Sequence, residues 1–190
     1  MNETWLIVGL GNPGKDYTRT RHNCGFRALD ILAEQLGCKV DKGKFQGLYG
    51  QCTYRGKKLL LLKPQTYMNL SGKAVRYWLQ ELKIEKQNLL VVVDDIALPF
   101  GELRMRTKGS DGGHNGLKNI AELLQSTDYA RLRFGIGGDF SRGHQVDYVL
   151  GQWTDEERTN MPPRLKVFGD AILSFVAVGL ERTMNNFNKK

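Results

Sequence analysis

The fold of this chain is decided by the stretch Leu89-Leu90-Val91-Val92-Val93-Asp94-Asp95. Its unbroken apolar run, rich in β-branched residues, predicts a strand that is buried on both faces in the middle of a sheet. A second short apolar run, Trp5-Leu6-Ile7-Val8, predicts another buried strand near the N-terminus. Because two acidic residues follow the first run directly, we expect a carboxylate at the end of the central strand.

Predicted helices and strands alternate on both sides of this stretch. Apolar residues at helical spacing predict helices at residues 26–36, 70–82 and 116–124. Strand patterns occupy residues 48–54, 59–62, 101–108 and 131–136. We expect Pro162-Pro163 to open a long C-terminal helix that runs through Leu180. The alternation predicts an α/β fold, a single three-layer domain over residues 1–190 with a central mixed, mostly parallel twisted sheet flanked by helices.

Length and composition are those of one globular domain. The chain has 190 residues, of which 41% are hydrophobic and 25% charged, and this composition excludes an intrinsically disordered chain. The N-terminal segment lacks the pattern of a signal peptide, and no run approaches the ~20 apolar residues of a membrane span. We therefore expect a cytoplasmic protein. The net charge of +8 favours a polyanionic partner such as a nucleic acid.

The three cysteines, Cys24, Cys38 and Cys52, are an odd number at unmatched spacings, without a CxxC pair. This pattern indicates neither a zinc site nor a disulfide framework. We expect reduced and mostly structural thiols, as in cytosolic proteins.

A glycine-rich segment after the first strand, Gly9-Leu10-Gly11-Asn12-Pro13-Gly14, matches the dinucleotide-binding pattern GxGxxG. That motif needs a helix that opens within the glycines, whereas residues 15–23 show no amphipathic period. The acidic residue that the motif places about 20 positions later could only be Asp30 or Glu34, and both lie within the predicted helix. A nucleotide-dependent oxidoreductase is thus a hypothesis carried by this match alone. The turn can instead hold Asn12 at the end of a strand, where ligands bind in open α/β sheets.

Several polar segments near the ends of predicted elements carry groups suited to hydrolysis. They are Asn12-Pro13-Gly14, Arg21-His22-Asn23, Tyr67-Met68-Asn69 and Gly112-Gly113-His114-Asn115-Gly116. No Ser or Cys stands in a nucleophile-elbow context, and no metal-binding spacing occurs, so a hydrolase built from these groups would activate water with a His base. Asp94 is the best candidate for the carboxylate that fixes the tautomer of that base. Side-chain amides can donate to a developing oxyanion.

The same segments resemble, in the same order, the bacterial peptidyl-tRNA hydrolases. The resemblance runs from about residue 6 to residue 150 and includes Gly9–Gly14, Thr20–Asn23, Pro64–Gly72, Asp94-Asp95 with Leu98-Pro99, Gly112–Lys118 and Arg131–Gly137. It implies a monomeric α/β enzyme that hydrolyses the ester between a peptide and the 3′ end of tRNA. It also implies that no metal and no cofactor take part.

The resemblance further implies roles for individual residues. His22 matches the general base of the family, Asp94 the acid that keeps this His basic, and Asn12 the residue that favours N-blocked peptidyl over free aminoacyl substrates. The family usually has a second carboxylate three residues after the position of Asp94, where this chain has Ala97. Tyr17 and Tyr67 match aromatic positions of the substrate cleft. Asn69 and Asn115 match residues that position the substrate and water.

A basic rim is expected to hold the tRNA body through its phosphates. The candidates are Arg104, Arg106, Lys108, Lys118 and Arg133. Contacts of this kind are not sequence-specific, which suits an enzyme that serves every tRNA. The charge alone also fits a non-catalytic RNA-binding adaptor on the same scaffold. The set of base, acid and amides favours the enzyme, because an adaptor has no need of a base.

Overall fold

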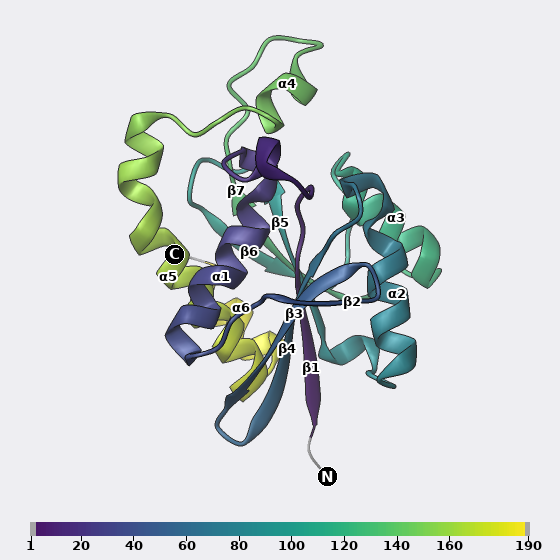
Figure 1. The fold of residues 1–190 in the computed structure, drawn as a ribbon. Coiled ribbons are helices and arrows are strands. Elements are labelled where there is room, and N and C mark those ends of the chain that lie inside the picture. The colour runs from purple at the N-terminus through teal and green to yellow at the C-terminus, as the bar shows by residue number, and fades with distance from the viewer. Residues whose placement is uncertain (1–2, 189–190) are drawn as a thin grey trace.

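The computed structural model describes residues 3–188 as one domain built on a seven-stranded sheet (Figure 1). The strands are β1 (Thr4–Gly9), β2 (Lys42–Lys44), β3 (Gly47–Tyr54), β4 (Lys57–Pro64), β5 (Leu89–Asp95), β6 (Leu103–Arg106) and β7 (Ala130–Gly135). Their order across the sheet is β2-β3-β4-β1-β5-β7-β6. The central strands β4, β1, β5 and β7 run parallel to one another, and β2, β3 and β6 pair antiparallel. The predicted α/β fold with a mixed, mostly parallel sheet is confirmed.

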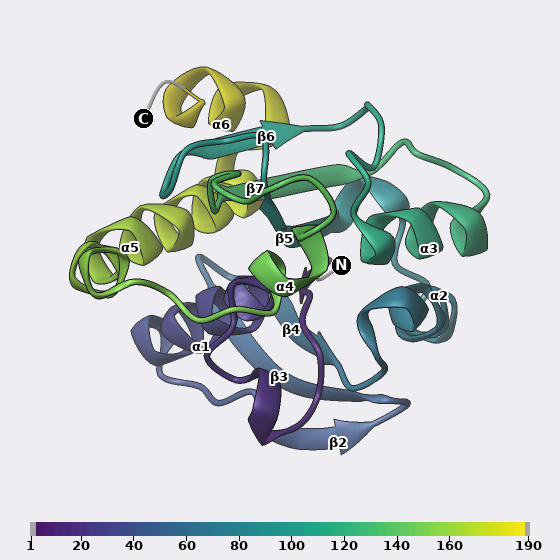
Figure 2. The same ribbon diagram turned by 90° about the horizontal axis from the view of Figure 1, so that it is seen from above.

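Helices cover both faces of the sheet (Figure 2). One face carries α1 (Cys24–Leu36) and α5 (Asp155–Val178), and the other carries α2 (Ser71–Glu81) and α3 (Asn115–Leu124). Successive strand residues alternate between the two layers, so that Val92 packs with α1 and α5 whereas Val91 packs with α2 and α3. Because both faces of β5 are buried, its sequence is an unbroken apolar run and not an alternation of apolar and polar residues.

The apolar spacing predicts the first three long helices to within two residues at each end. α1 stops where predicted, because Gly37 adopts the left-handed conformation with φ 74° that closes helices. The elements that the sequence analysis does not predict are the short ones: α4 (Gln145–Val149), α6 (Leu180–Phe187), β2, and the 3-10 turns η1 (Lys15–Tyr17), η2 (Arg21–Asn23), η3 (Met68–Leu70) and η4 (Lys86–Asn88). Since η1 and not a helix follows the glycine-rich segment, the dinucleotide-binding geometry is absent there. No helix within residues 3–188 has the length and apolar character needed to cross a membrane.

The prediction that Pro162-Pro163 opens the C-terminal helix is wrong. α5 begins at Asp155, and both prolines lie inside it. The helix starts at a capping box, in which the Thr154 hydroxyl accepts from the backbone N–H of Glu157 and the Glu157 carboxylate accepts from the backbone N–H of Thr154. The sequence signal was therefore Thr-x-x-Glu, which fixes a helix start more directly than a proline does.

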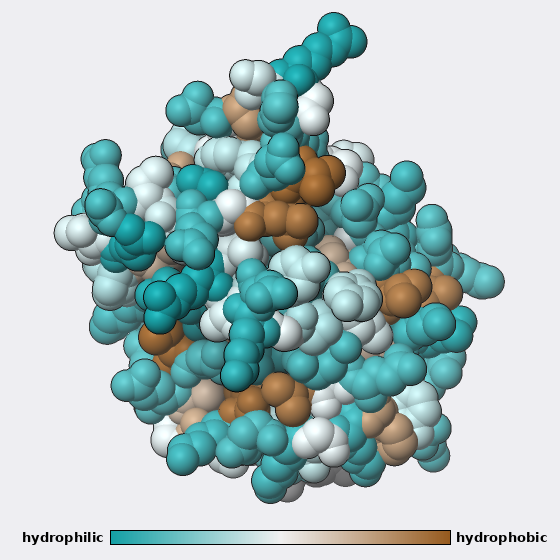
Figure 3. Space-filling model, turned by 45° about the horizontal axis from the view of Figure 1, so that its top comes forward, coloured by the Kyte–Doolittle hydropathy of each residue, from teal (hydrophilic) through white to brown (hydrophobic). Residues whose placement is uncertain are grey.

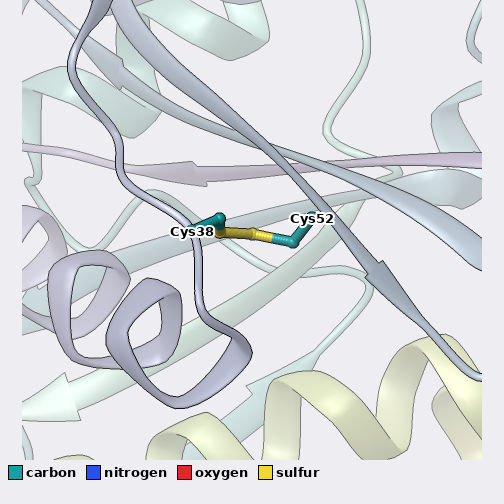
Figure 4. Close-up of a disulfide and its surroundings, with 2 residues drawn as sticks. All are labelled: Cys38 and Cys52. Carbon is teal, nitrogen blue, oxygen red and sulfur yellow. A yellow bond between two sulfur atoms is a disulfide. The ribbon is translucent and has the colours of Figure 1, made fainter.

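The expectation of reduced thiols is wrong for two of the three cysteines. Cys38, just after α1, forms a disulfide with Cys52 on β3 (Figure 4). Their Cα atoms lie 5.9 Å apart, within the range of about 4.4–6.8 Å usual for bridged cysteines. Cys24 is free and buried, and burial raises the pKa of its thiol. Two cysteines in one short segment give no sequence signal for pairing, because only the tertiary approach of β3 to the end of α1 brings them together.

The carboxyl ends of β1 and β5 lie side by side where the chain departs in opposite directions. From β1 it passes through α1 toward the β3–β4 side of the sheet, and from β5 it continues to β6 and β7. Such a reversal leaves a crevice beside the strand ends, the usual ligand site of open α/β sheets. α1 begins directly against this crevice, because Gly25 has no side chain. A Cβ on Gly25 would lie 2.5 Å from the Leu10 nitrogen and 2.6 Å from the Val92 oxygen.

Replacing Gly25 by Ala tests this close approach. We expect Gly25→Ala to lower the free energy of unfolding by about 1–3 kcal/mol, because the added methyl overpacks the junction of α1 with β1 and β5. Urea unfolding followed by circular dichroism measures the change. The control is Gly43→Ala on β2, where no described atom lies within 4 Å of the new Cβ, and its change should stay within about 0.5 kcal/mol. Equal stability of the two variants would contradict the packing described.

Candidate active site

Segments that follow β1 and β4 meet the start of α3 at the crevice. Gly116, in the first turn of α3, marks the meeting point, since a Cβ there would lie 2.8 Å from both Leu10 Cδ1 and Met68 Sδ. Leu10 comes directly after β1, and Met68 opens the 3-10 turn that follows β4. Polar residues next to these anchors are therefore held close to the end of β5, which carries Asp94.

His22 and Asp94 form the direct contact at the centre of the crevice. The Nδ1 atom of His22 lies 2.9 Å from Oδ1 and 2.8 Å from Oδ2 of Asp94. The Asp94 side chain is 3% exposed and that of His22 12% exposed. Because a carboxylate only accepts, Nδ1 carries the proton of this bond, and Nε2 is the basic nitrogen. Nε2 has no hydrogen-bond partner among residues 3–188, and His22 lines a cavity of about 70 Å³ next to Asp94.

A second imidazole, that of His114, binds the same carboxylate. Its Nε2 lies 2.9 Å from Asp94 Oδ1, and its ring centroid is 4.9 Å from that of His22. His114 is the N-cap of α3, and its Nδ1 accepts from the backbone N–H groups of Gly116 and Leu117, at 3.1 and 3.3 Å. An atom that accepts two N–H groups carries no proton, so Nε2 carries it and donates to Asp94. The two rings therefore hold opposite tautomers around one carboxylate.

The charge state of Asp94 follows from these bonds. Burial by itself raises the pKa of this carboxyl, but the electrostatic attraction of the His114 and His22 rings and the hydrogen bonds that their N–H groups donate outweigh burial and hold the pKa well below its usual range. Asp94 is therefore ionised throughout the ordinary working range of pH. An ionised carboxylate favours the Nδ1–H tautomer of His22 and stabilises the imidazolium that forms when Nε2 takes up a proton.

Arg21 fastens the turn that carries His22 to the C-terminal part of the chain. Its guanidinium donates to the Tyr148 carbonyl and to Glu157 Oε1, both at 3.2 Å. The same guanidinium lies 4.2 Å from the centroid of the Tyr148 ring. Arg21 is 8% exposed, so these contacts are largely shielded from water. They tie α4 and the first turn of α5 to the residue next to His22.

Asn12 is buried in the crevice, with its amide held in one orientation. Its Oδ1 accepts from the backbone N–H of Met68 at 2.6 Å. Asn23 fixes the backbone of Asn12 on both sides, because its Oδ1 accepts from the Asn12 N–H and its Nδ2 donates to the Asn12 carbonyl, at 2.8 and 2.9 Å. The Met68 bond fixes which end of the amide is the oxygen, and the NH₂ group of Asn12 remains as a donor. The site thus presents a fixed hydrogen-bond donor at the end of β1.

Of the other cleft residues named from the sequence, Asn115 lies beside His22, whereas Tyr17, Tyr67 and Asn69 belong to the segments that follow β1 and β4. The rings of Tyr17 and Tyr67 meet edge to face with centroids 6.5 Å apart, and Tyr67 is 58% exposed. Asn69 is exposed on η3, and Asn115, also exposed, follows His114 and lines the cavity beside His22. Both amides are therefore accessible to a ligand.

The basic candidates fall into two groups. Arg104 and Arg133 are register partners across β6 and β7, and Arg106 continues the same face of β6. Arg133 lines the cavity beside His22 and pairs with Asp95 at 3.4 Å. The second group is Lys108, on the loop after β6, and Lys118, on α3, and both are exposed. The surface toward the top of Figure 1, where the parallel strands end, is largely hydrophilic with separate small hydrophobic patches (Figure 3).

Ala97 stands where the family usually has its second acid, and the neighbouring backbone is held by Asp95. The Asp95 carboxylate accepts from the Ala97 N–H at 2.8 Å and pairs with Arg133. Ala97 is exposed and carries no polar side chain. The acid that orders this turn is therefore Asp95, one residue after the acid that binds His22.

Sequence reasoning missed His114 as a functional residue. It singled out the segment Gly112–Gly116 but chose only Asn115 from it. A signal was present, because a His just before a helix can cap it with one ring nitrogen and leave the other for a second partner. The sequence does not show that the start of α3 approaches the end of β5, because this approach is a tertiary contact.

His22, Asp94 and His114 are also the residues here that could hold a metal ion. Each offers one ligand atom, and these atoms lie within 4.8 Å of one another. The hydrogen bonds described above place a proton on each ring nitrogen that faces the carboxylate. A metal ion bound by the two nitrogens that face Asp94 would have to displace both protons, because only an unprotonated imidazole nitrogen can be a ligand.

The depressed pKa of Asp94 predicts how pH changes stability. Its stabilisation is present above the unfolded-state pKa of about 3.9 and is lost as pH falls through the lower folded-state pKa. We expect Asp94→Asn to cost about 1.5–3 kcal/mol near neutral pH, and the difference from the unsubstituted protein should shrink below about pH 4. Chemical unfolding over this pH range measures it.

The control is Asp147→Asn, because the Asp147 side chain is 83% exposed and also contacts a His. It should show no pH-dependent difference from the unsubstituted protein. A cost for Asp94→Asn that stays constant on acidification would contradict the charge state assigned to Asp94.

Comparison with known proteins identifies the family of this chain. The family model described as Peptidyl-tRNA hydrolase matches residues 6–190. A peptidyl-tRNA hydrolase of Bacteroides fragilis is 53% identical and one of Phocaeicola vulgatus 54% identical, each over 98% of this chain and 99% of the relative. The crystal structure of the Acinetobacter baumannii peptidyl-tRNA hydrolase, 34% identical, superposes with a TM-score of 0.91 over 99% of this chain and 96% of its own. The chain therefore belongs to the peptidyl-tRNA hydrolase family.

Proposed function

We propose that this protein hydrolyses the ester bond between a peptide and the 3′ end of tRNA, with water activated by His22. The observation that carries the proposal is the pair of hydrogen bonds from His22 Nδ1 to the buried Asp94 carboxylate, which leaves Nε2 without a partner in the described chain. Family membership supports the substrate, and the crevice supports the chemistry.

The reaction begins with proton transfer from water to His22 Nε2 as the water oxygen attacks the ester carbonyl. The imidazolium so formed is stabilised by Asp94, which stays ionised. Collapse of the tetrahedral intermediate breaks the bond to the 3′ oxygen of the tRNA, and the imidazolium returns its proton to that oxygen. General-base catalysis of this type supplies ~10²–10⁴-fold in rate, and an ester needs less help than an amide because its alkoxide departs more readily.

Amide groups around the base position the substrate. Asn69 and Asn115 are exposed at the crevice edge, where they can hold the substrate and the attacking water. Their NH₂ groups can also donate to the developing oxyanion, a contribution of ~10²–10³-fold for one donor. Tyr17 and Tyr67 supply the aromatic walls of the substrate cleft.

Asn12 selects N-blocked substrates over free aminoacyl-tRNA. Its amide oxygen is occupied by the Met68 N–H, so the side chain offers a donor to the substrate. A peptidyl or N-acylated group carries a carbonyl that accepts from this donor. The ammonium of a free aminoacyl group has only donors and meets an unmatched NH₂.

His114 acts on the base through Asp94. It donates to Asp94 Oδ1, one of the two carboxylate oxygens that His22 Nδ1 contacts, and is itself fixed by two backbone N–H groups. This second bond limits rotation of the carboxylate and keeps it aligned with His22 Nδ1. His114 is thus a positioning residue, and it has no contact with the reacting atoms in this scheme.

The tRNA body binds through phosphates on the basic rim, without a metal or cofactor in the chemical step. The protein acts as a monomer in the cytoplasm, where peptidyl-tRNA released from ribosomes is recycled. The net charge of +8 supports binding of a polyanion. Contacts to phosphate alone allow one enzyme to serve tRNAs of every sequence.

Removing the base tests the proposal. We expect His22→Ala to lower the rate of peptide release from purified peptidyl-tRNA by ~10²–10⁴-fold, with tRNA affinity largely intact. Single-turnover kinetics and a filter-binding assay measure the two quantities. His144→Ala is the control, because the side chain of this His is 64% exposed and lies outside the crevice contacts. Near-normal cleavage by His22→Ala would refute the base, and tRNA binding without any cleavage by the unsubstituted protein would identify an RNA-binding adaptor.

Asn12→Asp tests substrate selection. The variant replaces the fixed donor by an acceptor, which repels a peptide carbonyl and attracts an ammonium. We expect the ratio of kcat/KM for N-acetylated over free aminoacyl-tRNA to fall by about tenfold, equivalent to ~1.4 kcal/mol. Asn119→Asp is the control, because its Oδ1 also accepts a backbone N–H, that of Gly72, but on the α2–α3 side. An unchanged ratio in Asn12→Asp would contradict the role of this amide.

A further inference from the structure

A large polar groove, separate from the cavity beside His22, is lined at one point by Asn12. Its volume is about 770 Å³, within the range of about 300–1,000 Å³ usual for ligand sites. It runs between the segment after β1, the outer side of α1, and the ends of β3 and β4. We call it the basic groove and define it by Asn12, Lys15, Arg19, Arg27, Lys63 and Arg158.

The charge of the basic groove is strongly one-sided. Five of its lining side chains are cationic, and Asp30 is the one acid among the described residues that line it. Asp30 is engaged by Lys63 at 2.8 Å. Arg158 is also paired, with Asp155 outside the groove.

The other three cations are unpaired. Lys15, Arg19 and Arg27 have no hydrogen bond or ion pair from their side chains to any residue within 3–188, and the first two are exposed. Unpaired cations gathered in a concave surface concentrate positive potential there. The basic groove is therefore suited to bind a ligand with more than one negative charge.

An aromatic ring accompanies these charges. Phe26 is half-buried on α1 and lines the groove. The Lys63 ammonium lies 5.7 Å from its ring centroid. A basic channel with aromatic faces is the usual surface for single-stranded nucleic acid, because cations meet the phosphates and rings meet the bases.

We propose that the basic groove binds the single-stranded nucleotides at the 3′ end of the tRNA and so delivers the ester bond to His22. The inference rests on the proposed function, since it places one part of that substrate. Asn12 belongs both to the groove and to the substrate-selecting contacts, so the ester lies where the two regions join.

The charge pattern favours nucleotides over peptide as the occupant. The peptide differs from one substrate to the next, and a surface with three unpaired cations would discriminate among peptides by their charge. The 3′ end of tRNA carries the same phosphates in every substrate. A fixed set of cations therefore matches the constant part of the substrate.

Two model esters separate nucleotide binding from the chemical step. One is an N-acetyl-aminoacyl ester of adenosine, which has no phosphate, and the other is the same ester on a trinucleotide with the sequence of the tRNA 3′ end. The variant is Arg19→Gln with Arg27→Gln. The control is Arg55→Gln, an exposed Arg in the turn between β3 and β4 at the other end of the sheet.

We expect the double variant to raise KM several-fold for the trinucleotide ester relative to the adenosine ester, with kcat for the trinucleotide ester little changed. The plot of log KM against log salt should flatten by roughly 0.7 for each phosphate that the substitutions leave without a bound cation. Arg55→Gln should leave both quantities as in the unsubstituted protein. A purely structural effect of the substitutions would not change the salt dependence.

Each other outcome overturns the proposal in a distinct way. Equal losses on the two esters would mean that the groove does not hold phosphates. A penalty on adenosine esters that grows with peptide length would assign the groove to the peptide. No change on either ester would leave the groove without this role. Failure of the unsubstituted protein to cleave either ester or peptidyl-tRNA would instead contradict the proposed function.

Discussion

One buried carboxylate organises the crevice of this protein. Asp94 accepts hydrogen bonds from the Nδ1 of His22 and from the Nε2 of His114 and lies almost fully out of water. An ionised carboxylate in such a place is costly unless charge-assisted hydrogen bonds compensate for its lost hydration. The two imidazoles provide that compensation, and the direction of each bond follows from it. Because Asp94 accepts the proton of His22 Nδ1, the Nε2 atom of His22 is left free. The proposed chemistry requires this free nitrogen.

The fold fixes the positions of Asp94, His22 and His114 relative to one another. Asp94 ends a strand held between two parallel neighbours, and His22 sits in a turn that leads into α1. α1 reaches the strand ends because Gly25 leaves room for backbone contact, and α3 presents His114 as its N-cap. Arg21 then secures the His22 turn from the C-terminal side through Tyr148 and Glu157. The site therefore rests on backbone packing from several parts of the chain, and a small displacement of any one changes the bond to Asp94.

Much of this could be predicted from the sequence, and the failures have physical causes. The apolar run that ends in Asp94 identifies a central strand, and the polar residues around His22 and Asn12 stand out because strand ends are where such groups gather. The start of α5 is set by the capping box at Thr154, whereas Pro162 and Pro163 stand in the helix interior, where proline normally disfavours a helix. The Cys38–Cys52 disulfide and the bond from His114 to Asp94 could not be predicted. Both depend on how elements distant in sequence approach one another, and local patterns do not contain that information.

The central claim is that Asp94 holds two imidazoles in opposite tautomers, and ¹⁵N NMR of the imidazole rings tests it most directly. Long-range ¹H–¹⁵N spectra distinguish protonated from unprotonated ring nitrogens, and the single variants at positions 22 and 114 assign the signals. For the neutral rings, the account predicts a proton on Nδ1 of His22 and on Nε2 of His114. A spectrum in which both rings carry the proton on the same kind of nitrogen, or in which His22 is the Nε2–H tautomer, would contradict it.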